Sequence, residues 1–155
     1  MANFSKVFKF SLAELFILLE AWFMFFKWDL LISFTQYKNW SNELECLHNT
    51  NDSKITSDTL IYEQVKPIIE LSEIAGRFHF RKMNCLRRCI SQGKILEKRG
   101  FKTCMHIGVR FDNKKLVAHA WLTFQGIVIN DSEDVTTRYS ELKSINGQEI
   151  LRHFK

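Results

Sequence analysis

Apolar residues crowd the start of the chain at spacings of three and four positions, which is the period of an α-helix. Ser11 can cap such a helix, and Glu14 follows it by three positions, which is the spacing of a capping box. Leu18, Ala21 and Phe25 make the opposite face apolar as well. The pattern predicts a helix within Phe10–Phe34, with its period set by Leu12, Leu15, Phe16, Leu19, Trp22, Phe23, Phe26 and Leu30.

A helix that is apolar on most sides must be buried or must meet a partner. Glu14, Glu20, Lys27 and Asp29 interrupt the run, so no uncharged stretch reaches the ~18 residues that a membrane span needs. Two of these charges would also fall inside the apolar region of a signal peptide. We therefore expect a cytoplasmic protein whose aromatic helix packs on its own domain or on a partner protein. Peripheral membrane contact through this helix is a less favoured alternative.

The middle of the chain begins with a polar stretch, residues 46–58, which predicts a loop. Asp58 is placed to cap a helix behind it, because apolar residues recur at helical spacing over residues 60–71. Pro67 falls inside that run, and we expect it to kink or restart the helix.

After Gly100 the period of the apolar positions changes to two, which is typical of β-strands. A turn at residues 112–114 and a tight turn at Gln125-Gly126 separate the apolar runs. Helices followed by an antiparallel meander indicate an α+β fold, with N-terminal helices and a small antiparallel sheet. The three predicted strands cover residues 104–111, 117–124 and 127–130.

The composition fits one domain: 155 residues, 46% of them hydrophobic, with one proline and six glycines. We expect residues 1–155 to form a single domain, with a hydrophobic helical region and polar loop over 1–57 and a catalytic core over 58–155. The net charge of +5 favours acidic partners, but no nucleic-acid motif accompanies it, so no nucleic-acid partner is expected. Two basic groups predict a solvated helix face or a site for an acidic peptide: Arg81, Lys82, Arg87, Arg88, and Lys94, Lys98, Arg99, Lys102.

The four cysteines are too few for a secreted disulfide scaffold, so free thiols are expected. Asn84 is placed to cap a helix over Cys85–Arg99, and Gly100 follows as its stop signal. Cys85 then lies in the first helical turn. A cysteine attacks a carbonyl as its thiolate, so its pKa must be lowered. The helix N-terminus, Arg87 and Arg88, and a nearby imidazolium are each expected to lower the pKa of Cys85.

His119 is the candidate base, because it lies mid-strand between Ala118 and Ala120, which leave room for its ring. Trp121 is assigned to the opposite face of the strand. Asp131 follows the next strand, and the hairpin between them brings its carboxylate beside the imidazole, where it can orient the ring and stabilise its charge. Each residue alone also has an ordinary structural interpretation: a small buried cysteine, a packed histidine and a turn aspartate.

Taken together, several motifs resemble the leader peptidases of lasso-peptide biosynthesis over roughly residues 60–140. That family has a transglutaminase-like, papain-like fold. The resemblance implies that Cys85 is the nucleophile, His119 the general base and Asp131 the orienting acid, with no metal or cofactor. The motifs, in chain order, are Asn84-Cys85-Leu86-Arg87-Arg88-Cys89, Leu96-Glu97-Lys98-Arg99-Gly100, His106-Ile107-Gly108-Val109-Arg110, Ala118-His119-Ala120-Trp121 and Asn130-Asp131.

The resemblance further implies removal of the leader from a ribosomally made lasso-peptide precursor. A separate, ATP-dependent macrolactam-forming cyclase would then close the ring with the freed amine of the core peptide. The chain starts almost directly with its aromatic segment, so we expect leader recognition to reside in a separate protein. The expected partners are therefore the precursor peptide, this recognition protein and the cyclase.

Three other interpretations remain open. The same triad would serve a transglutaminase or an arylamine acetyltransferase on the same fold. Cys85, Cys89, Cys104 and His106 would offer zinc ligands, although C-x3-C followed by C-x-H is not a familiar finger pattern. A pure adaptor would use the aromatic helix as its binding surface.

Overall fold

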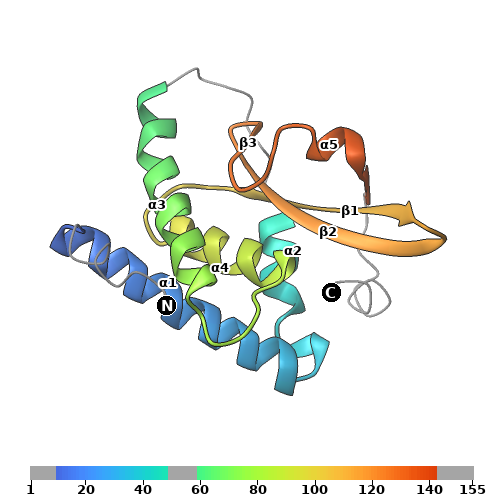
Figure 1. Cartoon of the computed structure of the whole chain (residues 1–155), viewed down its shortest axis with the longest axis horizontal. Helices are drawn as coiled ribbons and strands as arrows, with labels where there is room; N and C mark the ends of the chain where they lie inside the picture. Colours follow the sequence, from blue (N-terminus) through green and yellow to red (C-terminus); the bar gives the residue numbers. More distant parts are fainter. Residues whose placement is uncertain (1–9, 49–58, 143–155) are drawn as a thin grey trace.

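The computed structural model describes residues 10–48 and 59–142 (Figure 1). Helices come first in the chain and antiparallel strands follow, which confirms the predicted α+β fold. The helical elements are α1 (Leu12–Phe34), the short 3-10 helix η2 (Tyr37–Asn39), α2 (Ser41–His48), α3 (Thr59–Arg77), α4 (Cys85–Glu97) and α5 (Val135–Arg138). The strands are β1 (Cys104–Asp112), β2 (Lys115–Phe124), β3 (Ile127–Val128) and β4 (Ser140–Glu141).

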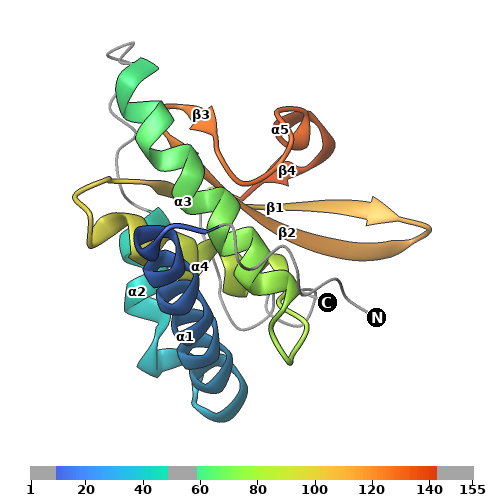
Figure 2. The same cartoon turned by 60° about the vertical axis from the view of Figure 1, so that its left-hand side comes forward.

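The four strands form one antiparallel sheet in the order β3-β2-β1-β4. A long β1–β2 hairpin dominates it, and Asn113 and Lys114 make its tight turn with positive φ angles of 47° and 66°. The register of the hairpin places Gly108 opposite His119. In Figures 1 and 2, α1, α2 and α4 lie on one side of the hairpin and α5 lies on the other.

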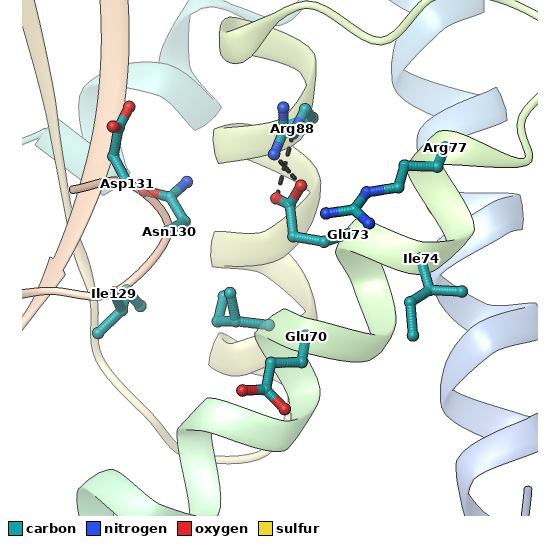
Figure 3. A pocket seen from close by; sticks show the side chains of 9 residues that line it. Glu70, Glu73, Ile74, Arg77, Arg88, Ile129, Asn130 and Asp131 are labelled. Carbon is teal, nitrogen blue, oxygen red and sulfur yellow. Dashed lines mark hydrogen bonds and ion pairs between the residues drawn. The ribbon is translucent and has the colours of Figure 1, made fainter.

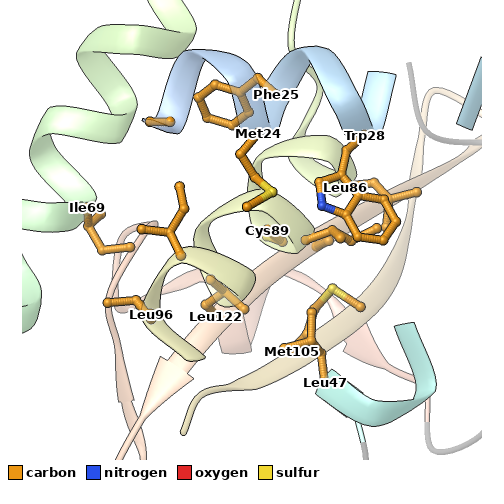
Figure 4. Close-up of a cluster of buried hydrophobic side chains, with 14 of the residues drawn as sticks. Met24, Phe25, Trp28, Leu47, Ile69, Leu86, Cys89, Leu96, Met105 and Leu122 are labelled. Atoms are coloured by element: carbon orange, nitrogen blue, oxygen red, sulfur yellow. The ribbon is translucent and has the colours of Figure 1, made fainter. Parts of the chain in front are cut away.

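Helix α4 lies at the centre of the core and contacts α1, α3 and the two long strands. Its buried side chains, among them Leu86, Ile90 and Leu96, join residues from every neighbouring element (Figure 4). Burial of this apolar stripe fixes the rotation of α4, because turning the helix would expose the stripe to water. The contributions of other elements include Met24, Phe25 and Trp28 from α1, Leu47 from α2, Ile69 from α3, Met105 from β1 and Leu122 from β2.

Helix α1 begins with the predicted capping box: the Glu14 N–H donates to the Ser11 hydroxyl at 3.3 Å, and the Ser11 N–H donates to the Glu14 carboxylate at 2.7 Å. One face packs on α3 and α4, which confirms docking on its own domain. Within residues 10–48 and 59–142, no helix is long and apolar enough to cross a membrane. The outer face of α1 leaves several large apolar side chains exposed: Leu12, Phe16, Leu19, Phe23 and Phe34.

Several local predictions need correction. Helix α3 runs without a break through Pro67, so the predicted restart is wrong. Pro67 and Glu63 are both exposed, so the carbonyl that loses its hydrogen bond can face water. Strand β3 ends at Val128 rather than at residue 130, because the Leu122 N–H donates to the Asn130 side chain at 2.8 Å and not to the backbone carbonyl of Ile129, which lies opposite it.

The predicted polar loop, residues 46–58, is only partly described. Residues 46–48 form the end of α2 and not a loop. The remainder, including the proposed cap at Asp58, lies outside the described residues. Helix α4 ends at Glu97, two residues before its predicted end, and Gly100 follows with a φ of 82°.

Candidate active site

Cys85 is the first residue of α4, as its capping pattern predicts. The Asn84 side-chain oxygen accepts from the Arg87 N–H at 3.1 Å, which satisfies one of the amides left unpaired at a helix start. Backbone N–H groups of Ala120, Leu86 and Cys85 itself face the sulfur. The thiol is therefore held where α4 meets β2.

His119 lies in the middle of β2 and is paired with a carboxylate. Its Nε2 lies 2.5 Å from Oδ2 of Asp131, which follows β3 and folds back beside β2. The other carboxylate oxygen accepts from the Ser132 N–H at 2.7 Å, so the orientation of the aspartate is fixed on both sides. With Nε2 engaged, Nδ1 is the ring nitrogen left for a proton from the thiol.

The structure brings the three predicted site residues together. Cys85, His119 and Asp131 line one cavity of about 200 Å³, whose remaining wall is made by Arg88, Cys89, Ala120 and Asn130. A thiol, an imidazole and a carboxylate in series can perform nucleophilic acyl transfer.

Aromatic rings hold the imidazole in place. His119 stacks on Tyr139, with ring centres 4.9 Å apart, and on Trp121 at 6.4 Å. The assignment of Trp121 to the opposite face was wrong, because residues two positions apart in a strand share a face. Gly108 leaves the space for this stack, since a Cβ there would lie 2.9 Å from both the Trp121 ring and the Tyr139 Cβ.

Comparison with known protein families identifies the superfamily of this chain. A family model described as the transglutaminase-like superfamily matches residues 36–144. The chain belongs to this superfamily. Its members include cysteine peptidases and acyltransferases, and they are typically enzymes. Neither the curated proteins nor the solved structures contain a match. The match starts before α2, so η2 and α2 belong to the transglutaminase-like part of the chain.

The pKa of Cys85 in this transglutaminase-like site is raised, which is opposite to the expected direction. Burial is the largest cause, because it disfavours the charged thiolate, and the negative charge of Asp131 adds to it. The backbone N–H groups of Ala120 and Leu86 lower the pKa of the thiol, but they do not outweigh the effect of burial. The resting thiol is thus protonated, and the reaction must remove its proton.

The cations expected to lower this pKa are occupied elsewhere. Arg87 Nε lies 2.8 Å from the carboxylate of Asp29, in α1. Arg88 forms a two-pronged ion pair with Glu73, in α3. Their charges are therefore largely neutralised before they can act on the sulfur.

The pKa of Asp131 is lowered. Burial is the largest single influence and would raise it, but the hydrogen bonds from His119 and Ser132 together outweigh burial. An ionised Asp131 can stabilise a positive charge on His119, which is the role that an orienting acid requires.

Sequence reasoning missed a chain of buried amides behind the site. Asn130 Nδ2 donates to Oε1 of Gln92 at 2.8 Å and to the Cys89 sulfur at 3.2 Å. Gln92 Nε2 in turn donates to Ser72 Oγ at 2.9 Å and to Glu73 Oε1 at 2.6 Å. The loop that carries Asp131 is thereby tied to α4 and α3. One available signal was Gln92 itself, a polar residue two turns after Cys85 on the buried face of α4.

Cys89 does not resemble a nucleophile, and the residues proposed as zinc ligands do not form a metal site. Cys89 is fully buried, and burial strongly raises its pKa. The ring nitrogens of His106 are engaged, Nδ1 with Glu141 at 2.5 Å and Nε2 with Thr123 at 2.8 Å. In the described part of the chain, no three histidine, cysteine or acidic side chains gather to hold a metal ion, so the zinc interpretation is wrong for Cys85, Cys89, Cys104 and His106.

Proposed function

We propose that this chain is a cysteine peptidase that removes the leader peptide from a lasso-peptide precursor. The observation that carries the proposal is the pair of His119 and Asp131 at 2.5 Å, in the cavity that Cys85 also lines. The superfamily supports a cysteine peptidase or acyltransferase. The ordered motifs around these residues support leader removal within that range.

In the first half of the reaction, the Cys85 sulfur attacks the carbonyl at the leader–core junction, and His119 Nδ1 takes the thiol proton. Asp131 stabilises the imidazolium that forms. The C–N bond then breaks, and His119 gives the proton to the departing core amine. The leader remains as a thioester on Cys85.

In the second half, His119 takes a proton from water, and the resulting hydroxide attacks the thioester carbonyl. The C–S bond breaks, and the Cys85 sulfur recovers the proton. The backbone N–H of Cys85, at the positive end of α4, is the proposed donor to the carbonyl oxygen as its negative charge develops.

We further propose that a separate leader-recognition protein delivers the precursor and that a macrolactam-forming cyclase receives the freed core. The exposed face of α1 supports such docking, because Leu12, Phe16, Leu19 and Phe23 repeat at spacings of four and three and so form one apolar stripe. Contact of this stripe with a membrane surface is the competing outcome.

The test is a cleavage assay, read by mass spectrometry, with a lasso-peptide precursor and its leader-binding protein, which are sought among the genes that neighbour this one. We expect hydrolysed leader and free core, and we expect Cys85→Ala to lower the rate at least about a thousandfold. Cys89→Ala is the matched control and should keep most activity. If Cys85→Ala keeps its cleavage activity and Cys89→Ala loses it, the assignment of Cys85 as the nucleophile is wrong.

The masses of the products separate the remaining alternatives. A cross-linked or acetylated product would identify another acyltransferase of the superfamily, and an unchanged precursor would favour the adaptor role. A Phe16→Ser/Phe23→Ser variant should lose binding to the leader-binding protein while keeping its unfolding temperature. Loss of vesicle binding alone would instead assign the stripe to a membrane.

A further inference from the structure

A second cavity, of about 530 Å³, adjoins the one that holds Cys85. Arg88 lines both cavities, so the second opens beside the first turn of α4. Its other walls are the end of α3 and the segment that connects α3 to α4. It is lined by Glu73, Gly76, Arg77, His79, Arg81, Lys82, Met83 and Arg88.

The wall of this cavity is strongly cationic. Four basic side chains and one carboxylate, that of Glu73, line it, and one of the four, Arg81, is already paired with Asp29 of α1 at 2.9 Å. Arg88 and Gln92 already use this carboxylate as their acceptor. Arg77 and Lys82 are exposed and have no ion-pair partner among the described residues. The cavity therefore offers unused donors and a net positive charge, and its acidic acceptor is taken.

His79 adds an independent sign of a missing acceptor. Its side chain is only 8% exposed, and its Nδ1 accepts from the Arg81 N–H at 3.2 Å. A neutral ring must then carry its proton on Nε2. Within the described ranges this Nε2 is buried without a hydrogen-bond partner, an arrangement that usually costs stability. A bound acceptor would remove that cost.

A neighbouring groove of about 450 Å³ has a different character. It runs between α3 and the loop of Asp131, and the Arg88–Glu73 pair borders it as well (Figure 3). Its wall is apolar at Ile69, Ile74 and Ile129 and of mixed charge elsewhere, with Glu70 and Asp131 as well as Arg77. The groove shares Glu73, Arg77 and Arg88 with the cationic cavity, so a chain passing Cys85 meets one cationic wall and one of mixed charge.

We propose that the cationic cavity is a subsite for a carboxylate side chain, Asp or Glu, of the peptide that Cys85 attacks. A carboxylate accepts hydrogen bonds without donating any, which matches the free groups of Arg77, Lys82 and His79. This inference rests on the proposed role of Cys85 as nucleophile. It makes acidic residues near the scissile bond a determinant of substrate choice.

The test uses short reactive peptides that alkylate Cys85. Peptidyl chloromethyl ketones extend to the leader side of the site and bromoacetyl peptides to the core side. Each series carries Asp, or Asn as its neutral counterpart, one, two or three residues from the reactive carbon, with Gly elsewhere. Rates of Cys85 alkylation are followed by peptide mapping. In at least one position, Asp should react about tenfold faster than Asn, and added salt should reduce the difference.

Two double variants test whether this cavity causes the faster reaction of the Asp probes. Arg77→Gln/Lys82→Gln should abolish the preference for Asp by bringing the rate with Asp probes down to the rate with Asn probes. Lys102→Gln/Lys115→Gln removes the same charge from exposed sites elsewhere and should keep the preference. Equal rates with Asp and Asn at every position, or a preference that survives the Arg77→Gln/Lys82→Gln change, would overturn the subsite.

Failure of the proposed function gives a different result. If Cys85→Ala keeps its activity in the cleavage assay, Cys85 is not the nucleophile. The subsite is then judged by binding of acetyl-Gly-Asp-Gly-amide to Cys85→Ala, measured by NMR shifts of the Arg77, His79 and Lys82 amides. Shifts equal to those with the Asn peptide would reject it.

Discussion

Cys85 lies in surroundings that keep its sulfur protonated, because burial and the charge of Asp131 raise its pKa above the ordinary 9.0. We therefore predict that the rate of its alkylation by iodoacetamide still rises as the pH passes 9, whereas the unfolded chain reaches half its maximal rate near that pH. Peptide mapping of the Cys85 peptide gives the rates. A rate that is already constant at neutral pH would show a preformed thiolate–imidazolium pair and contradict this prediction.

At the scale of single residues, local patterns predicted that Cys85, His119 and Asp131 lie together, but they misjudged the electrostatics around the thiol. Asn84 predicted the helix start and therefore the place of Cys85, because a cap acts on amides within three residues of it. The partners of Arg87 and Arg88, Asp29 and Glu73, come from other helices. No pattern in the sequence near the thiol reveals such distant carboxylates, so the direction of the pKa shift could not be predicted.

Among the elements, the β1–β2 hairpin depends on one glycine. In Gly108→Ala, the new Cβ would lie 2.9 Å from the buried Trp121 ring and from the Tyr139 Cβ. We predict a loss of about 1–3 kcal/mol in unfolding free energy, because this crowded site must rearrange. The Trp121 ring also stacks on His119, so alkylation of Cys85 should change as well.

The control for this variant is Gly76→Ala in α3, where the nearest atom to a new Cβ is 3.4 Å away, an ordinary contact. It should be neutral or slightly stabilising, since alanine favours a helix over glycine by up to about 1 kcal/mol. Thermal and urea unfolding measure both variants. Equal stabilities of Gly108→Ala and wild type would show that the ring stack does not need this space.

The elements themselves followed from the period of the apolar residues, and their ends from caps and turns. The exceptions have tertiary causes. Strand β3 is short because the Asn130 side chain takes the hydrogen bond of the Leu122 N–H. Helix α3 passes through Pro67 because the affected face is exposed, and exposure is a property of the packed molecule. The period of the apolar residues predicts neither the hydrogen bond of Asn130 nor the exposure around Pro67.

For the whole molecule, the period of α1 predicted a buried or partnered helix but not which face would be buried. That choice depends on α3 and α4, which form from residues much later in the chain. Asp29 makes the same point, since it is a charged residue in an apolar run and yet is 1% exposed. It lies 2.9 Å from Arg81 Nε and 2.8 Å from Arg87 Nε, so it joins α1 to the segment before α4 and to α4 itself.

The cluster of Asp29, Arg81 and Arg87 ties α1 to the helix that carries Cys85. A second acidic residue of α1 provides a matched control for its removal. Glu20, also in α1, pairs with Lys98 and Arg99 but is partly exposed. We predict that Asp29→Asn lowers the free energy of unfolding by about 3 kcal/mol, because it leaves the largely buried guanidinium of Arg87 without its counter-charge and also loses the pair with the more exposed Arg81. Glu20→Gln should cost less than about 1 kcal/mol, since solvent screens that pair. Urea unfolding measures both, and iodoacetamide labelling reports on Cys85. If Asp29→Asn is no less stable than Glu20→Gln, α1 is not held to the helix that carries Cys85 by this cluster.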